Sequence, residues 1–501
     1  MPSGKESEIT KASRRIVILI LIATVLIFGI PLYRETTSIY RAELPGDEIQ
    51  ELSNTLKERV HFNTKVYLDL DDSFSYMIPQ AESLIKKKLN ALNEQLLNVR
   101  SIELLRKTEP IDYYSDYILT IKHVKDDQKK TEQFDITPLA KAITIYFTDE
   151  NLNKIDEMIA NVLVDHIFKE EVQEFNNLMK GMSKPVEKDL VIPYSPKYNV
   201  VFSLVIENGR SVAWEIDEAL LLFTPLFDRL KHFTNFTVST QIQRYCFLTS
   251  EPKEDASGNF LIDEPSLSTF VNYGDWNLVN YDINPTINFI VYFPKVNFDG
   301  KQLKIENSKS NSFLIPQWGG VYIFNKDMPI LSSSEVLIPD TELSPIMEVF
   351  ASQLVRLLGM PSCPKSLLTR IDILSRLTIY NNLKGSLDNL VSLIKLTDSL
   401  SEISIPSSTR THVLEALDCI RTSIALVNKS KFSAAMEYSS KALLSSNRAF
   451  FEKEMVQQTY FPSEHKLAVF LPLLGPMCSI LVLGLIKLVK EFKKERKLKK
   501  E

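Results

Sequence analysis

The chain has 501 residues, of which 44% are hydrophobic and 24% charged, and its formal net charge is −5. This length fits roughly two or three domains. Its 14 glycines are under half the usual share of about 7%, and apart from Gly319–Gly320 no two of them lie closer than nine positions. This spacing excludes the G-x-G-x-x-G turn and the G-x-x-x-x-G-K-[ST] loop, and with them the enzymes that bind nucleotides through these loops.

The first element is an uncharged run of 18 residues, Ile16–Tyr33, preceded by the segment 1–15 with its four basic residues. A run of this length predicts a transmembrane helix. A signal peptide also begins with basic residues, but its apolar part is about 7–15 residues long and ends at a small-x-small cleavage site, which does not follow here. We interpret residues 16–33 as an uncleaved signal anchor, with a cleaved signal peptide as the alternative.

Strand-like and helix-like segments alternate between residues 34 and 340. Runs rich in β-branched and aromatic residues, bounded by turn residues, predict strands at 66–70, 117–121, 142–147, 199–206, 237–242, 287–293 and 320–324. Apolar residues that recur every three or four positions predict helices at 81–98 and 152–168. The alternation predicts a lumenal α/β domain over 34–340, a mixed sheet with packed helices.

Beyond residue 340 the strand signals stop, and a helical subdomain is predicted over 341–466. Its first helix is expected to have Ser344 as N-cap and Pro345 at the first helical position, and to end just before Gly359. Further helical patterns cover 366–380, 386–400, 408–428 and 431–455.

The last element is a second uncharged run, of 20 residues, Leu467–Ile486, which predicts a second transmembrane helix. Pro472 and Pro476 lie four residues apart on one face of it, with Gly475 beside them. Each proline frees a backbone carbonyl that lipid cannot satisfy, so such a helix is better tolerated against protein neighbours. These three residues are candidates for packing within the membrane, with a simple kinked anchor as the alternative.

Charge near the two runs predicts the topology. The C-terminal tail, 487–501, has eight basic and three acidic residues, and basic clusters beside both runs predict that both termini are cytosolic. Lys497 and Lys499 resemble a dilysine retrieval signal of endoplasmic reticulum membrane proteins, and a stop-transfer cluster is the alternative. Without both tails, 46 basic and 58 acidic residues remain, a net charge of −12, which offers no electrostatic footprint for nucleic acid.

A lumenal location for the middle of the chain places three cysteines, Cys246, Cys363 and Cys419, on the oxidising side of the membrane. Three cysteines cannot all pair, so at most one disulfide is expected, and the sequence does not say which pair would form it. The same topology makes two sequons available as N-glycosylation candidates, at Asn235 and Asn428.

Motifs of common catalytic chemistry are missing from the sequence. The six histidines are scattered, and neither an H-E-x-x-H helix nor a G-x-S-x-G elbow occurs. Cys246 or Cys363 paired with a distant histidine would be the nucleophile of a hydrolase, although a buried thiol or a disulfide is the expected role of either. No catalytic residue, cofactor or metal site is predicted from these residues.

Several segments resemble the PIG-S family, a subunit of the glycosylphosphatidylinositol (GPI) transamidase of the endoplasmic reticulum membrane. They are Pro31–Pro45, Ile287–Pro294, Ser312–Asn325 with its Gly-Gly pair, Leu357–Gly359, Tyr460–Pro462 and the proline-bearing second run. The resemblance implies a two-pass membrane glycoprotein in a multi-subunit complex that replaces a C-terminal signal of a proprotein by a GPI lipid. It also implies that the cysteine-protease-like catalytic residues belong to another subunit.

The leading hypothesis is therefore a non-catalytic subunit that supports GPI-anchor biosynthesis by scaffolding the catalytic subunit and the substrate. The resemblance implies that the partners are this catalytic subunit and the membrane subunits of the complex, with the proprotein and the GPI lipid as further candidates. The alternative is a membrane-anchored lumenal cysteine hydrolase that acts on its own.

Overall fold

A computed structural model of the chain forms two compact units. One comprises residues 1–53, 386–417 and 444–501, and the other comprises 54–385 and 418–443. The structure describes residues 8–29, 31, 40–70, 76–107, 116–124, 133–181, 190–248, 252–254, 258–263, 267, 284–306, 308–326, 336–400, 403–453, 455, 472, 475–476, 479–490 and 493.

The first sheet of the larger unit has five strands in the order β2-β1-β3-β5-β4. All neighbours are parallel except β4, which runs antiparallel to β5. The strands are β1 (Phe62–Asp69), β2 (Arg100–Arg106), β3 (Tyr117–His123), β4 (Phe134–Ile136) and β5 (Ala142–Phe147). Alternate residues of β1, from Phe62 to Leu68, are buried, which is the two-residue period of a strand with one face in a core.

Helices that follow the strands cover this buried face. They are α4 (Met77–Leu92), α5 (Leu96–Val99), η4 (Asp149–Lys154), α6 (Ile155–Asn161), the π-helix η5 (Val162–Ile167) and α7 (Lys169–Met179). Ile85 and Leu89 of α4 are fully buried, as their spacing predicts. The helix expected over 81–98 ends at Leu92, which is 45% exposed, and α5 follows as a separate turn.

A second sheet of five strands has the order β13-β14-β11-β6-β8. Its strands are β6 (Lys197–Ile206), β8 (Asn235–Arg244), β11 (Thr286–Phe293), β13 (Ser312–Ile315) and β14 (Gly319–Ile323). Again only the fourth strand in sequence is antiparallel, and again the order across the sheet is second, first, third, fifth, fourth. In place of the single sheet predicted over 34–340, the structure has two five-stranded sheets with the same topology, together with smaller ones.

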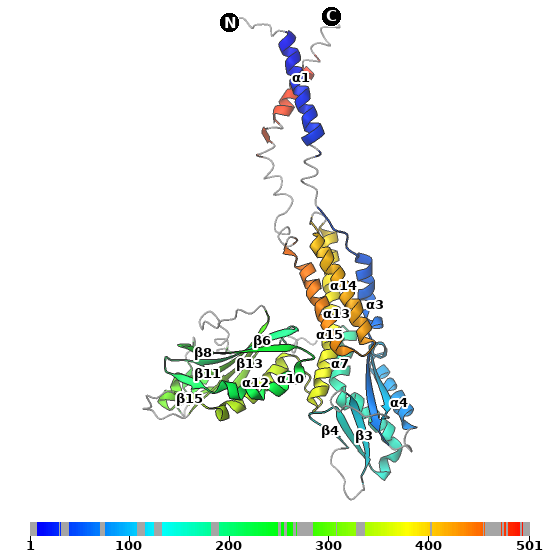
Figure 1. The fold of residues 1–501 in the computed structure, drawn as a ribbon, viewed down its shortest axis with the longest axis vertical. Coiled ribbons are helices and arrows are strands. Elements are labelled where there is room, and N and C mark those ends of the chain that lie inside the picture. Colours follow the sequence, from blue (N-terminus) through cyan, green and yellow to red (C-terminus); the bar gives the residue numbers. More distant parts are fainter. Residues whose placement is uncertain are drawn as a thin grey trace. The chain divides into compact units, whose positions relative to one another are not determined.

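Both faces of the second sheet are covered, as a mainly parallel sheet requires. On one face lie the helical segments α9 (Ile216–Ala219), η6 (Leu220–Leu222), α10 (Thr224–Leu230) and α12 (Asp340–Leu357), the last two visible in Figure 1. The rings of Phe202, Phe289 and Phe350 pack there, with centroids 4.8–6.2 Å apart. The other face packs on a small sheet of β9 (Lys253–Glu254), β10 (Phe260–Ile262) and β12 (Leu303–Ile305). The remaining elements are η8 (Lys295–Asp299) and the pair of β7 (Val212–Trp214) with β15 (Val336–Ile338).

The Gly-Gly pair lies where α12 and β11 approach β14 most closely. A Cβ atom on Gly319 would lie 1.8 Å from the backbone oxygen of Asn288, and one on Gly320 would lie 1.9 Å from Oε1 of Gln353. A side chain at Gly319 would therefore displace the backbone of β11, and one at Gly320 would displace the side chain of Gln353. This close approach explains why a glycine-poor chain has two adjacent glycines here.

Helix α12 begins four residues before the N-cap predicted at Ser344. Ser344 instead donates its hydroxyl to the carbonyl oxygen of Asp340, and Pro345 lies inside the helix. The N–H of Asp340 at the true start donates to Glu215, a residue far away in sequence. The predicted position was wrong because this cap is non-local, whereas the predicted end at Gly359, with φ +75°, is confirmed.

Long helices make up the rest: α3 (Gly46–Arg59), α13 (Leu367–Ser399), α14 (Ser407–Val427) and α15 (Phe432–Phe450). The two helices predicted at 366–380 and 386–400 are one helix of 33 residues, α13. In the smaller unit, the segment after the first apolar run joins this helix, because Arg41 donates to the carbonyl of Thr397 at 2.6 Å.

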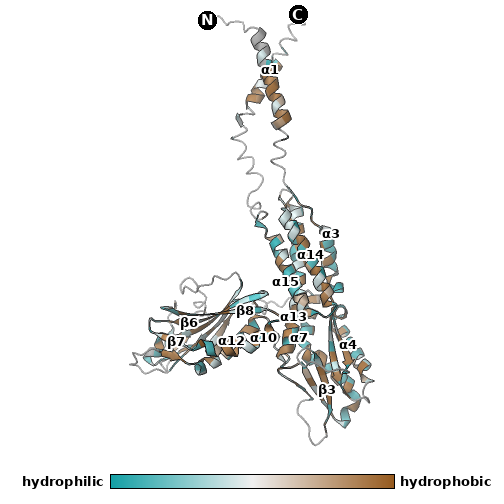
Figure 2. Cartoon of the chain, viewed as in Figure 1, coloured by the Kyte–Doolittle hydropathy of each residue, from teal (hydrophilic) through white to brown (hydrophobic). Residues whose placement is uncertain are grey.

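The terminal parts contain α1 (Glu8–Thr24), the π-helical turn η1 (Val25–Gly29) and a helix over 479–490. Figure 2 shows apolar residues along α1 and along the strands of both sheets. Within the described ranges, no helix combines the length and the apolar character needed to cross a membrane.

Candidate functional site

A buried cluster of three charges lies between the first sheet and α13. Glu171 of α7 accepts from Arg376 at 2.6 Å and 2.9 Å and from Arg100 at 3.2 Å. The side chains are at most 2% exposed. Both guanidinium groups also lie over the ring of Phe168, at 4.9 Å for Arg100 and 5.9 Å for Arg376. Elements from three parts of the chain thus meet at one carboxylate.

The protonation of this cluster follows from its pairing. Burial alone would raise the pKa of Glu171, but the two guanidinium groups outweigh it and hold that pKa below its ordinary value. Burial would likewise lower the pKa of Arg376, but its two bonds to Glu171 raise that pKa above the ordinary value. Burial lowers the pKa of Arg100, but a guanidinium group keeps its proton at neutral pH, so the cluster is ionised and carries a net positive charge.

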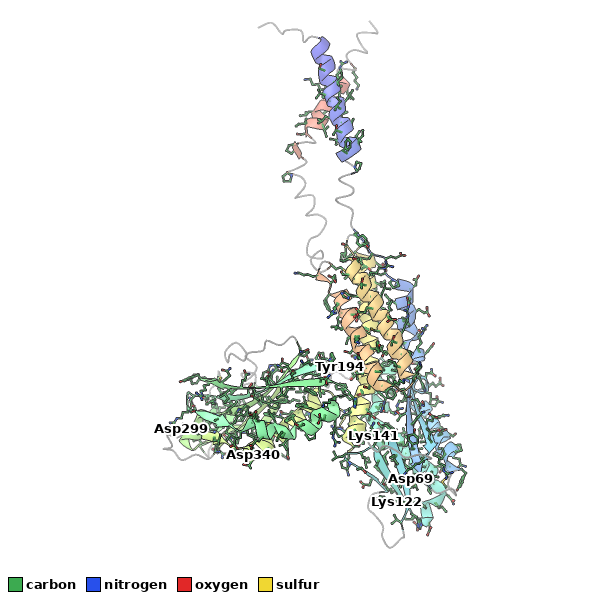
Figure 3. The ribbon with its side chains drawn as sticks, viewed as in Figure 1. Asp69, Lys122, Lys141, Tyr194, Asp299 and Asp340 are labelled. Carbon is green, nitrogen blue, oxygen red and sulfur yellow. The ribbon has the colours of Figure 1, made fainter. Side chains whose placement is uncertain are left out.

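A second polar cluster adjoins the first. Asp372 of α13 accepts from the hydroxyl of Tyr117 at 2.8 Å and from Lys141, which is labelled in Figure 3, at 2.6 Å. The ammonium group of Lys141 lies 5.2 Å from the centre of the Tyr117 ring. Burial, followed by the charge of Asp372, holds the pKa of Tyr117 well above its ordinary value. The phenol therefore stays protonated and donates to Asp372.

These residues form one wall of a cavity of about 680 Å³. The N-terminus of α15, with Lys431, Ser433 and Ala434, also lines this cavity, and β1 contributes Thr64 and Lys65. The remaining lining residues are Asn63, Asp116, Tyr117, Lys141, Asp372, Arg376, Ser430, Phe432 and Glu437. A second cavity of about 270 Å³ shares Lys141, Asp372 and Arg376 and is also lined by Arg229 and His232. A sequence motif could not have indicated this cavity, because its walls come from five separate segments.

Cys246, Cys363 and Cys419 are free thiols, and none of them lines either cavity. Cys246 is buried, which raises the pKa of its thiol to about 11 and leaves it protonated at neutral pH. Cys363 is exposed, and its backbone N–H donates to Glu170 at 3.1 Å. No histidine in the described ranges forms a hydrogen bond with Cys246 or Cys363. The arrangement of a hydrolase nucleophile is therefore not formed by the residues that the structure describes.

The two sequons differ in their surroundings. Asn235 is the first residue of β8 and is exposed. Asn428 also lies at the surface, but its side chain accepts from the N–H of His61 and donates to the carbonyl of Arg59, both at 2.9 Å. Glycosylation at either position stays a prediction, and Asn235 is the more accessible candidate.

The residues predicted for packing in the membrane are exposed: Pro472, Gly475 and Pro476 lie in helical backbone, and a Cβ on Gly475 would meet nothing within 4 Å. Their packing against partner helices stays a prediction, and Lys497 and Lys499 lie outside the described residues. Gly484, which the sequence analysis did not single out, lies against the other terminal helix, because its Cβ would lie 3.4 Å from the side chain of Ile18.

Three carboxylates also come close together near the start of α12. Ligand oxygens of Glu215, Glu218 and Asp340 lie within 4.8 Å of one another. Glu215 already accepts the N–H of Asp340, which accounts for part of this approach through the helix cap.

Comparison with known proteins identifies the family of the chain over nearly its full length. Residues 20–495 match the family model of the phosphatidylinositol-glycan biosynthesis class S protein, PIG-S. This chain belongs to the PIG-S family. It is 31% identical over 517 residues to the GPI transamidase component GPI17 of Saccharomyces cerevisiae, an alignment covering 96% of this chain and 92% of the yeast protein.

More distant members show the same near-complete coverage. The GPI transamidase component PIG-S homolog of Schizosaccharomyces pombe is 26% identical, over 95% of this chain and 84% of its own length. The GPI-anchor transamidase component PIGS of Homo sapiens is 25% identical, over 94% of each chain. The family resemblance drawn from a few segments is thus confirmed along nearly the full length.

Proposed function

We propose that this protein is a non-catalytic subunit of a GPI transamidase complex, in which it scaffolds the catalytic subunit and the proprotein. The observation that carries the proposal is the family match over residues 20–495, together with relatives that are named as transamidase components. The protonated thiol of Cys246 and the surroundings of Cys363 agree with catalysis by another subunit.

The proposal includes a two-pass arrangement in the endoplasmic reticulum membrane. Residues 16–33 and 467–486 form the spans, 34–466 is lumenal, and the tails 1–15 and 487–501 are cytosolic. Support comes from the two uncharged runs of 18 and 20 residues and from the basic residues beside both. The approach of Ile18 to Gly484 further supports two helices that lie side by side.

A surface for a partner subunit is offered by β8, the edge strand of the second sheet. Phe236 of β8 stacks on Phe227 of α10 at 4.6 Å, and Val238 and Ile242 follow on the same face but are 41% and 42% exposed. In the first sheet the topologically equivalent edge strand is β2, whose residues Ile102 and Leu104 are buried beside α4. Because α10 has 7 residues and α4 has 16, α10 leaves part of the edge strand of the second sheet uncovered, whereas α4 covers the edge strand of the first sheet. We assign this apolar strip, Val238 and Ile242, to a neighbouring subunit.

The test is affinity purification of the tagged full-length chain from membranes in mild detergent, followed by identification of the proteins that copurify. Copurification with the catalytic transamidase subunit is expected, and cells lacking the chain should lose GPI-anchored surface proteins. Restoration of anchoring by Cys246→Ala and Cys363→Ala variants would agree with a non-catalytic role. Cleavage of a GPI-signal substrate by the purified chain alone would contradict it.

A further inference from the structure

The two five-stranded sheets have four edge strands, β2, β4, β8 and β13, and three of them offer little to a further strand. β4 and β13 have only 3 and 4 residues. β2 has 7 residues, but part of its edge is already bound within the chain. The N–H of Arg100 donates to the carbonyl of Leu96. The N–H of Leu104 donates to the carboxylate of Glu82 on α4, at 2.8 Å. Among the described strands of these two sheets, β8, with 10 residues, is therefore the one long edge that is left open.

The outer edge of β8 is a row of backbone groups without partners. At the start of the strand, the N–H of Asn235 donates to the carbonyl of Pro196, the residue before β6. Because successive N–H groups of a strand point to opposite sides, those of the odd-numbered residues point to β6 and those of the even-numbered residues point away. The even-numbered residues are Phe236, Val238, Thr240, Ile242 and Arg244. None of their N–H groups, and none of the carbonyl groups of the first four, bonds to a described residue. Such a row is a template for one more strand.

The sequence of β8 lacks the features that usually protect an exposed edge. It has no lysine, no proline and no acidic residue, and its one charge is at the last position. Val238, Thr240 and Ile242 follow one another on the face toward α10, and all three are exposed. An open apolar edge promotes aggregation whenever it is uncovered, so it suits a partner that stays bound. This favours a resident subunit over a proprotein that leaves after each reaction.

Charge further indicates which kind of strand pairs here. Arg244 is exposed and forms no ion pair with a described residue, and its guanidinium group donates to the hydroxyl of Ser211 at 3.5 Å. A carboxylate at the opposite position of an added strand would make a favourable cross-strand pair. A second copy of β8 could not supply it, since β8 contains neither aspartate nor glutamate. The added strand therefore fits a different protein.

We infer that a neighbouring subunit of the proposed complex adds an extended segment to β8, as a sixth strand of the second sheet. The inference rests on the proposed function, which assigns the strip of Val238 and Ile242 to such a subunit, and it specifies how that subunit binds. The open N–H and carbonyl groups pair with the backbone of the added strand, which provides affinity. Apolar side chains opposite Val238 and Ile242 and a carboxylate opposite Arg244 provide selectivity.

Proline at an outward position tests backbone pairing separately from contact with the apolar strip. Thr240→Pro removes an N–H that has no partner among the described residues, and its ring obstructs a further strand. Affinity purification of the tagged full-length chain in mild detergent should then recover at least about tenfold less of the partner subunit. Thr240→Ala keeps the N–H and is the matched control, which should recover the partner like the parent chain.

A melting curve of each variant separates loss of pairing from loss of folding. Thr240→Pro should melt within a few degrees of the parent chain, because an edge strand tolerates proline where the N–H points outward. Gln241→Pro should melt lower, since the N–H of Gln241 points to β6. The two neighbouring prolines therefore have different expected effects on the free chain.

A photo-reactive residue at Ser239 identifies the occupant in the assembled complex. Ser239 lies on the other face from the strip, and neighbouring strands are about 4.8 Å apart, so a benzoylphenylalanine there reaches an added strand without replacing a strip residue. Capture of a transamidase subunit is expected. Hydrogen exchange adds a second readout: outward N–H groups of β8 should exchange at least about tenfold more slowly in the complex than in the isolated chain.

Equal recovery of the partner by Thr240→Pro and Thr240→Ala would overturn the inference, because the partner would then cover the strip without backbone pairing. Capture of the proprotein, of a second copy of this chain or of no protein from Ser239 would also overturn it. In these cases the parent chain still recovers the transamidase subunits, and the proposed function stands. Failure of the parent chain to recover any subunit would instead refute the proposed function, and the inference with it.

Discussion

Replacing Glu171 by glutamine tests how the interior of the larger unit is stabilised. The carboxylate accepts three hydrogen bonds from two guanidinium groups, at 2.6, 2.9 and 3.2 Å. Glutamine has nearly the same size, but its amide nitrogen is a donor and would face a guanidinium N–H. Both arginines would then remain buried without a counter-charge.

The expected cost follows from what the substitution leaves behind. At an effective dielectric constant of 20, one pair of unit charges 4 Å apart contributes about 4 kcal/mol. Removing one partner of a buried ion pair costs about 3–5 kcal/mol, because the desolvated charge on the other side stays in place. We therefore expect Glu171→Gln to lower the free energy of unfolding by about 3–5 kcal/mol, which is a large part of the stability of an ordinary domain.

Chemical denaturation of the full-length chain in detergent measures this loss, and hydrogen exchange of peptides from β2 and α7 locates it. Glu174→Gln is the matched control, since it removes one carboxylate from the same helix without breaking a bond between described residues, and should change stability by no more than about 0.5 kcal/mol. Replacing all three members, as Arg100→Met, Glu171→Leu and Arg376→Met, should cost less than Glu171→Gln alone. Equal effects of Glu171→Gln and Glu174→Gln would refute the reasoning.

Three further outcomes are expected from the same structure. The folded pKa of Glu171 lies below the ordinary 4.5, so its stabilisation is complete above about pH 4.5 and is lost as the pH falls toward the folded pKa; acid titration of Glu171→Gln should lack this loss. Cysteines replacing Ile18 and Gly484 should form a disulfide in oxidised membranes, and failure to cross-link would exclude the helix pair. Lysines replacing Val238 and Ile242 should abolish copurification with a partner subunit while the melting temperature stays within a few degrees, whereas lysine at Ser239 on the other face should not.

Local patterns predicted the strands well. Each of the seven predicted strands is present, with bounds that differ by at most four residues, because runs such as 199–206 and 287–293 are continuous apolar segments between turn residues. Among the strands that were missed, β4, β10 and β12 have 3 residues each, too few to establish a period, whereas β2 was missed although it has 7 residues and its burial alternates. The division into two sheets was missed because long-range contacts decide which strands pair. The local sequences of β1, β3, β6 and β11 would be the same whether these strands belonged to one sheet or to two.

The polar clusters were beyond prediction for a related reason. Glu171 lies 71 residues from Arg100 and 205 residues from Arg376, and its own segment, Lys169-Glu170-Glu171, has the composition of a solvated helix. What could have singled it out is its position among Val172, Phe175 and Leu178, all buried on one side of α7. A carboxylate on the apolar side of a helix needs a buried partner, although the sequence does not identify which one.

The equal topology of the two sheets makes their differences informative. Each half has a mainly parallel sheet whose second strand lies at an edge, and in the first half α4 covers that edge strand, whose Arg100 belongs to the buried charged cluster. In the second half the corresponding connection is three short helical segments, the longest of 7 residues, and the edge strand β8 keeps apolar residues at its surface. An edge strand with exposed apolar residues and ten paired positions would promote aggregation of an isolated protein. A partner that covers Val238 and Ile242 removes this liability, which is the behaviour expected of a chain that works within a complex.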